Sequence, residues 1–166
     1  MYKLSSQNHH RHLGREVLAG KMIVKLHHIH KSMKKKPQSA QLSCYCESGK
    51  PYAACCKPLH EGELTTTAEQ LMRSRYSAYV LGLEAYLLRT WHADTRPDTL
   101  DLTNDAKTTR WIGLKVKRHE VLDSSTAIVE FIASYKLNGK AHKLHEISRF
   151  IKQNEQWLYI DGEIAD

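Results

Sequence analysis

The chain has 166 residues, of which 41% are hydrophobic, and this length suits one compact domain with a small appendage. No apolar run approaches the roughly twenty residues that a membrane-spanning helix needs, so we expect no membrane span. The net charge of +7 is basic, and its distribution along the chain says more than its total.

The positive charge is concentrated at the start of the chain. Residues 1–42 contain nine Lys or Arg and one acidic residue, Glu16, for a net charge of +8, whereas the remainder carries −1. This segment also contains His9, His10, His12, His27, His28 and His30. It could be an arm that binds nucleic acid, or a loose metal-binding tract. We favour a disordered basic His-rich tail over residues 1–42, with Met33 as a candidate for the natural start.

All four cysteines lie within thirteen residues, in the pattern Cys44-x-Cys46 followed by Cys55-Cys56. Four thiolates brought together by one short loop can form a tetrahedral metal site. Disulfides are the alternative, with three possible pairings. Neighbouring cysteines are poorly placed to bridge each other, and no signal peptide precedes them. We therefore expect a reducing, cytoplasmic location and a metal site.

The predicted metal is Zn²⁺, the usual ion of closed thiolate sites, although such a cage also admits iron. A catalytic zinc keeps one coordination position open, and four thiolates leave none. The site is therefore predicted to be structural. The loop is too short to hold a hydrophobic core, so the metal should supply its folding energy.

The cysteine pattern, together with Ser48, Gly49 and Tyr52, resembles the SEC-C motif, the zinc-binding tail element of the SecA preprotein-translocation ATPase. The sequence departs from that motif at Ser43, where Pro is usual, and at Glu47, where Gly is usual. In the SEC-C family the last ligand is Cys or His, so His60 is a spare donor. SEC-C motifs are docking elements, and the resemblance implies a protein partner in the export or ribosome-associated machinery.

A helix is predicted after a linker marked by Pro58 and Gly62, where Thr66-x-x-Glu69 forms a capping box. Its apolar residues gather on one side of a helical wheel: Ala68, Leu71, Met72, Tyr76, Ala78 and Tyr79. Arg75 falls near the middle of this apolar arc. A buried guanidinium stays charged, so Arg75 needs a carboxylate or several other acceptors.

Arg73, by contrast, points away from the apolar arc. Gly82 is predicted to break the helix, and a second helix is expected over about 83–90, before Trp91 and His92. Residues 93–109 are polar and contain Pro97, which predicts a loop with room for one helical turn.

Strands are predicted from Arg110 onward. Ile112, Leu114 and Val116 alternate with polar residues. Val129, Phe131, Ala133 and Tyr135 form a second alternating set. Asn138-Gly139 is a hairpin signal that leads into a strand near 141–152, and a last strand is expected over 156–161. Two helices followed by a four-strand antiparallel meander indicate an α+β fold.

Several segments in this order resemble the bacterial YchJ-like family: Leu71-Met-Arg-Ser-Arg-Tyr-Ser-Ala-Tyr79, Thr90-Trp-His92, Glu146-x-Ser-Arg-Phe150 and Trp157-x-Tyr-x-Asp-Gly162. The resemblance runs from about 43 to 162. It implies a nuclear-transport-factor-2-like (NTF2-like) cone, in which a curved sheet wraps helices. The expected domains are a SEC-C zinc knuckle at 43–60 and an NTF2-like domain at 61–166.

The interior of this cone is a second candidate site. Its possible lining residues are Arg75, Tyr79, Trp91, His92, Glu146, Arg149, Trp157 and Asp161. They could form a ligand pocket or an acid–base site. They could equally form a structural ion pair, in which Arg75 is buried and paired with Glu146 or Asp161 among aromatic side chains. We favour the structural pair.

The hypothesis from sequence is a zinc-binding adaptor or docking protein without enzymatic activity. The alternative is an enzyme or small-molecule binder that uses the cone pocket. No Gly-rich phosphate loop and no Ser/His/Asp arrangement with supporting context favours a nucleotide-driven or hydrolytic function. Nucleic acid is a possible partner only through the basic tail.

A protein that begins at Met33 is expected to melt at the same temperature as the full chain. Residues 1–32 contain too little apolar surface to offset the entropy of ordering them. Differential scanning calorimetry of both forms tests this expectation. A clearly lower melting temperature for the shorter form would show that residues 1–32 pack on the domain.

Overall fold

The computed structural model describes residues 42–165, so the expectations for the basic tail lie outside the described residues. The elements, in chain order, are η1 (Tyr52–Ala54), α1 (Cys56–His60), α2 (Ala68–Leu81), α3 (Glu84–Arg89), α4 (Leu102–Thr108), β1 (Thr109–Val121), β2 (Thr126–Leu137), β3 (Lys140–Gln153) and β4 (Gln156–Ile164). Within 42–165, no helix is long and apolar enough to cross a membrane.

Helix α2 begins one residue later than the capping box predicted. Its N-cap is Thr67, whose hydroxyl accepts a hydrogen bond from the backbone N–H of Gln70 at 3.1 Å. The Gln70 side chain accepts in return from the backbone N–H of Thr66 at 2.7 Å. Gln70 therefore has the role that the sequence analysis gave to Glu69. The helix ends where predicted, at Gly82, which adopts the left-handed conformation with φ 68°.

The four strands form one antiparallel sheet in the order β1-β2-β3-β4. The predicted hairpin turn at Asn138-Gly139 is confirmed, because both residues have positive φ, as a type I′ turn requires. Asn154 and Glu155 have positive φ as well and join β3 to β4. Short connections of this kind fix the register of a meander.

Strand β1 departs from the simple alternation that the sequence suggested. A register shift between Trp111 and Gly113 interrupts its pairing with β2. As a result Trp111 and Leu114 pack against the core, whereas Ile112 is 44% exposed. An irregularity in one strand reverses the side on which the preceding residues lie, and the alternation of Ile112, Leu114 and Val116 in the sequence does not reveal it.

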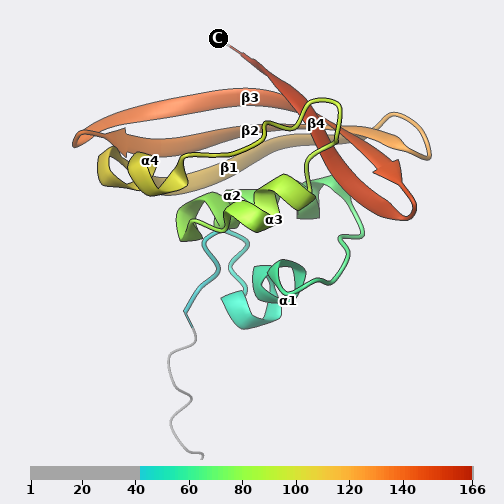
Figure 1. The fold of residues 1–166 in the computed structure, drawn as a ribbon, viewed down its shortest axis with the longest axis horizontal. Helices are drawn as coiled ribbons and strands as arrows, with labels where there is room; N and C mark the ends of the chain where they lie inside the picture. Colours follow the sequence, from blue (N-terminus) through green and yellow to red (C-terminus); the bar gives the residue numbers. More distant parts are fainter. Residues whose placement is uncertain (1–41, 166) are drawn as a thin grey trace, which may run out of the picture. The chain divides into compact units, whose positions relative to one another are not determined.

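The predicted α+β fold is confirmed. Helix α2 lies between α1 and the sheet, with α3 on the same side of the sheet as α2 (Figure 1). The face of the sheet that α2 covers is called the inner face below. Leu71 and Tyr76 of α2 pack there against Val129 and Phe150. A second cluster joins Leu59 of α1 to Leu87 of α3.

The irregularity in β1 leads to a stability prediction. Leu114→Ala is expected to lower the free energy of unfolding by about 2–5 kcal/mol, because Leu114 is 8% exposed and its loss leaves a cavity. Ile112→Ala should change it by about 0.5 kcal/mol or less, as is usual for surface positions. Urea denaturation of both variants measures the difference. Equal losses would contradict the observed strand geometry.

Candidate functional site

The four cysteine sulfur atoms converge on one point. All four Sγ atoms lie within 4.8 Å of one another. Cys46 Sγ is 3.6 Å from Cys55 Sγ, and Cys55 Sγ is 3.9 Å from Cys56 Sγ. A tetrahedral site with Zn–S bonds of about 2.3 Å has sulfur–sulfur edges of about 3.8 Å. A disulfide requires about 2.05 Å, so the cysteines are free and their arrangement fits a metal ion.

A tight loop brings the two cysteine pairs together. The backbone N–H of Cys44 donates to the carbonyl of Lys50 at 2.8 Å, and an isolated bridge joins Ser43 to Pro51. Between these contacts the chain turns through Glu47 at φ 58° and Gly49 at φ 74°. Both values lie in the left-handed region, which explains why the SEC-C motif usually has Gly at the position of Glu47.

Hydrogen bonds around the sulfur atoms favour a thiolate at Cys46. Hydrogen bonding by Cys56, and then by Ser48 and Cys44, lowers the pKa of Cys46 to about 4. The same contact raises the pKa of Cys56. The thiols of this cluster titrate as a coupled group, and metal binding requires that they be deprotonated.

His60, the spare donor, is used elsewhere. Its Nε2 lies 2.9 Å from the backbone carbonyl of Ser74 and its Nδ1 lies 2.9 Å from the hydroxyl of Tyr52. A carbonyl can only accept, so Nε2 carries the hydrogen and Nδ1 accepts from Tyr52 in the neutral ring. Burial lowers the pKa of His60 and favours this neutral form. His60 fixes the knuckle (residues 43–60) to α2 and does not join the four sulfur atoms.

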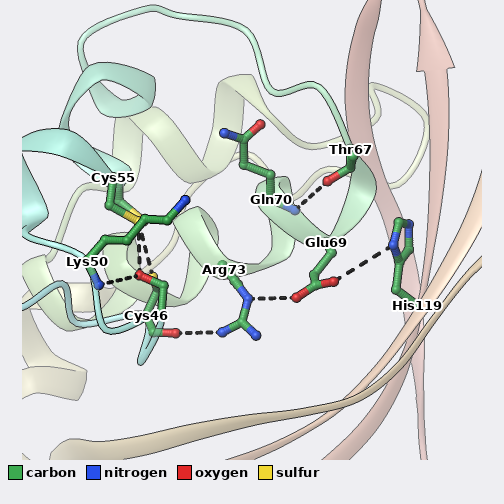
Figure 2. Close-up of polar contacts among 10 residues, drawn as sticks. Cys46, Lys50, Cys55, Thr67, Glu69, Gln70, Arg73 and His119 are labelled. Carbon is green, nitrogen blue, oxygen red and sulfur yellow. Dashed lines mark hydrogen bonds and ion pairs between the residues drawn. The ribbon is translucent and has the colours of Figure 1, made fainter.

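Arg73 forms a second link between the knuckle and the NTF2-like domain. Its Nη1 donates to the carbonyl oxygen of Cys46 at 2.9 Å, and its Nε donates to Glu69 Oε1 at 2.8 Å (Figure 2). The other oxygen of Glu69 lies 3.9 Å from His119 Nδ1 on β1. On α2, Ser77 adds a contact of 3.7 Å to Cys44 Sγ. The sequence correctly placed Arg73 away from the apolar arc. It gave no sign of the contact of Arg73 with Cys46 or of the contact of Ser77 with Cys44.

Arg75 is buried as predicted, with 5% of its surface exposed, but its predicted carboxylate partner is absent. Among residues 42–165 it forms no ion pair. Its Nη1 donates instead to Leu87 O at 2.7 Å and to Thr90 Oγ1 at 2.8 Å, at the end of α3. Carbonyls in the last turn of a helix lack partners within the helix and carry partial negative charge, so they can stabilise a buried cation.

The two proposed carboxylate partners are engaged elsewhere. Glu146 accepts from Ser148 Oγ at 2.5 Å and from the Tyr159 hydroxyl at 3.3 Å. Asp161 forms a two-fold contact with Arg149, which is exposed. The Arg149–Asp161 pair therefore lies outside the interior to which the sequence analysis assigned it.

The eight predicted interior residues divide between several places. Arg75, Tyr79 and Glu146 line an inner cavity of 260 Å³. Trp91 does not line it but lies beside Arg75, whose Cζ is 5.0 Å from the Trp91 ring centroid. Trp157 is buried in the core and donates to Thr66 O at 3.3 Å.

His92 lies outside the cavity, where its Nε2 is 3.0 Å from the side-chain amide of Gln153. Ser148 and Trp111 also line the cavity, although the sequence did not point to them. The shared strand face of Glu146 and Ser148 was a usable signal for Ser148, whereas the irregularity in β1 concealed Trp111.

Comparison with known proteins identifies relatives of both parts. Residues 67–162 match the family model of the YchJ middle NTF2-like domain. A UPF0225 protein of Ralstonia nicotianae is 51% identical over 133 residues, which cover 74% of this chain and 92% of that protein. A UPF0225 protein of Chromobacterium violaceum is 48% identical, with coverages of 80% and 100%.

Two solved structures resemble the chain over 75% of its length. The solution structure of a SEC-C motif containing protein from Rhodopseudomonas palustris has 32% identity and a TM-score of 0.69, and all of that chain is covered. The crystal structure of a SEC-C motif containing protein from Psychrobacter arcticus has 31% identity and a TM-score of 0.64, with 83% of that chain covered. The similarity supports a shared architecture of cysteine motif and NTF2-like domain.

The sulfur geometry predicts one metal ion per chain in purified protein, with zinc expected. Cys46→Ser should lose most of this metal, because three thiolates and a hydroxyl form a poorer site. Elemental analysis by mass spectrometry measures the metal content of both proteins. Metal-free wild-type protein, with four thiols that react rapidly with an alkylating reagent, would refute the assignment.

Arg75→Ala is expected to destabilise the protein strongly. It removes two hydrogen bonds from a charged donor, worth about 1.5–3 kcal/mol each, together with the contacts of the guanidinium with the rings of Trp91 and Tyr159. Arg149→Ala is the matched control, because it also removes one guanidinium but from an exposed pair that is screened by solvent. Thermal unfolding should show a large loss for Arg75→Ala and little change for the control. Similar effects would argue against the buried role of Arg75.

Proposed function

The chain belongs to the UPF0225 family of YchJ-like proteins, and we propose that it is a zinc-binding adaptor whose knuckle docks a protein partner. The observation that carries the proposal is the closed set of four sulfur atoms within 4.8 Å of one another. A zinc ion held by four thiolates has no open position for substrate or water, so its role is to hold the shape of the loop.

The side chains that the loop displays support a recognition role. Cys44, Cys46 and Cys56 are buried, whereas Tyr45 and Lys50 between them face solvent. Tyr45 is 37% exposed, and its ring packs edge-on against Tyr52 with centroids 5.8 Å apart. A partly exposed tyrosine on a rigid loop is typical of the aromatic anchors of interfaces.

The hydrogen bonds that attach the knuckle to α2 and α3 also support a recognition role. Besides the contacts of Arg73 and His60, Arg89 of α3 donates to the carbonyl oxygens of His60 at 2.6 Å and Leu59 at 3.1 Å. The knuckle is therefore held against α2 and α3 on several sides. A surface that is already ordered loses less entropy on binding, which increases affinity.

For the partner we propose a component of the export or translation machinery, and hence a cytoplasmic site of action. Support comes from the SEC-C resemblance, since the R. palustris and P. arcticus relatives are both SEC-C motif proteins. Exposed Lys50 favours a partner whose docking surface carries an acidic group, whereas Lys57 is paired with Glu61 at 3.5 Å.

A charge reversal in the knuckle should therefore reduce partner capture. Lys50→Glu is expected to lower recovery of the specific partner at least tenfold, because it opposes the acidic surface of the partner. Lys117→Glu is the matched control: it reverses one charge at an exposed position on β1, outside residues 43–60. Quantitative mass spectrometry of proteins captured from lysate compares the variants with wild type.

Cys55→Ser gives a second comparison, because loss of the metal should abolish the same interactions. Proteins that are lost with both Lys50→Glu and Cys55→Ser, and kept with Lys117→Glu, are the partners predicted here. If the captured proteins are the same for all four chains, the knuckle is not a docking element.

A further inference from the structure

The inner cavity has the features of a built binding site. Its volume is 260 Å³, slightly below the range of drug-sized pockets, and it lies between α2 and the inner face of the sheet. It adjoins a larger groove of 970 Å³, with which it shares Tyr76, Tyr79, Trp111 and Leu144 as lining residues. A small molecule therefore has a route from solvent to the cavity.

Arg75 contributes a buried cation with unused hydrogen-bond donors. Its two bonds to α3 both come from Nη1. Among residues 42–165, no protein acceptor meets its Nε or Nη2, although the side chain lines the cavity. These two nitrogens form the edge of a guanidinium that matches the two oxygens of a carboxylate.

Aromatic rings leave the N–H groups of the guanidinium available. Arg75 Cζ lies 5.0 Å from the Trp91 ring centroid and 4.6 Å from that of Tyr159, and the two centroids are 4.9 Å apart. Both rings therefore contact the guanidinium as a pair of neighbours. Cation–π contacts stabilise the charge there without using its N–H groups. The N–H groups remain available to an acceptor that enters the cavity.

The carboxylate of Glu146 also lines the cavity, and hydrogen bonds hold it in place. Ser148 and Tyr159 donate to Glu146 Oε1, which fixes the orientation of this side chain. Gly162 on β4 leaves the space that Glu146 occupies, since a Cβ at that position would lie 2.2 Å from Glu146 Oε1. Glu146 and Arg75 form no ion pair with each other, so the cavity presents a separate acceptor and donor.

We infer that the inner cavity binds a small organic acid with an aromatic or apolar body and a hydroxyl or amino group away from its carboxylate. The carboxylate accepts from Nε and Nη2 of Arg75, and the hydroxyl or amino group donates to Glu146. Trp111 and Phe131 contact the body of the molecule. A ligand of this class adds an acceptor for Nε and Nη2 of Arg75 and a further donor for the carboxylate of Glu146.

This binding site is separate from the proposed docking function. None of the four cysteines lines the inner cavity, and neither Lys50 nor Lys57 does, although Tyr45 and Glu47 of the knuckle line the adjoining groove. Lys50→Glu should therefore leave ligand binding unchanged. Failure of the docking experiment and failure of the ligand experiment are then independent results.

The test uses 4-hydroxybenzoate, benzoate and methyl 4-hydroxybenzoate as probes. The first carries both polar ends, the second lacks the hydroxyl group, and the third lacks the carboxylate. Titration followed by ¹H–¹⁵N NMR should shift the indole N–H signal of Trp111 but not that of Trp157, which does not line the cavity. We expect 4-hydroxybenzoate to bind about tenfold more tightly than benzoate, and the methyl ester to bind at least tenfold more weakly than 4-hydroxybenzoate.

Two kinds of variant separate the contributions of the two ends. Arg75→Lys keeps the positive charge but loses the pair of parallel N–H donors, so both acids should bind at least tenfold more weakly. Glu146→Gln, and Gly162→Ala, which displaces Glu146, should abolish only the preference for 4-hydroxybenzoate over benzoate. These two variants leave Arg75 intact. They still test whether the cavity recognises the hydroxyl group of the ligand if Arg75→Lys does not fold.

Three results would overturn the inference. The first is no shift of Trp111 with either acid at millimolar concentration. The second is equal binding of 4-hydroxybenzoate and its methyl ester. The third is a preference for 4-hydroxybenzoate that survives in both Glu146→Gln and Gly162→Ala.

Discussion

Helix α2 is the element on which both candidate sites depend, because it is packed on two opposite sides. Leu71 and Tyr76 face the sheet, and Ser77 faces the cysteine sulfur atoms. A helix buried on two sides must satisfy each polar side chain that it carries. Arg73 bonds to the knuckle and Arg75 bonds to the end of α3, so these two neighbouring arginines join three parts of the chain. The apolar contacts hold the helix against the sheet, and its polar side chains determine where the knuckle and α3 are attached.

Much of the fold could be predicted from sequence because the relevant forces are local. Alternation along Val129 and Phe131, and the turn at Asn138-Gly139, depend on residues close together in the chain. The cysteine cluster was predictable for the same reason, since one short loop contains all four sulfur atoms. Each of these features needs only the neighbouring residues to be recognised.

The features that sequence reasoning missed come from tertiary contacts. Nothing in the sequence near Arg75 shows that the end of α3 presents neutral acceptors to it, so an ion pair was the natural expectation. The irregularity that turns Trp111 inward and Ile112 outward is likewise a property of strand pairing. The sequence predicted only a helical position for Ser77, whereas its hydroxyl contacts Cys44, a residue 33 positions earlier in the chain. Polar partners of buried groups are the hardest contacts to predict, because a hydrogen bond can be satisfied by many groups.

The contacts between the knuckle and α2 have a consequence for the amount of folded protein in a cell. A metal that binds only the folded loop stabilises everything packed against it by RT ln(1 + [M]/Kd), where [M] is the free metal concentration. Because Ser77, Ser74 and Arg73 of α2 all contact the knuckle, this linkage extends to the core of the NTF2-like domain. Scarcity of the metal would then increase the fraction of unfolded chains, which proteases remove. Metal supply would in this way control the abundance of the protein as well as the shape of the knuckle.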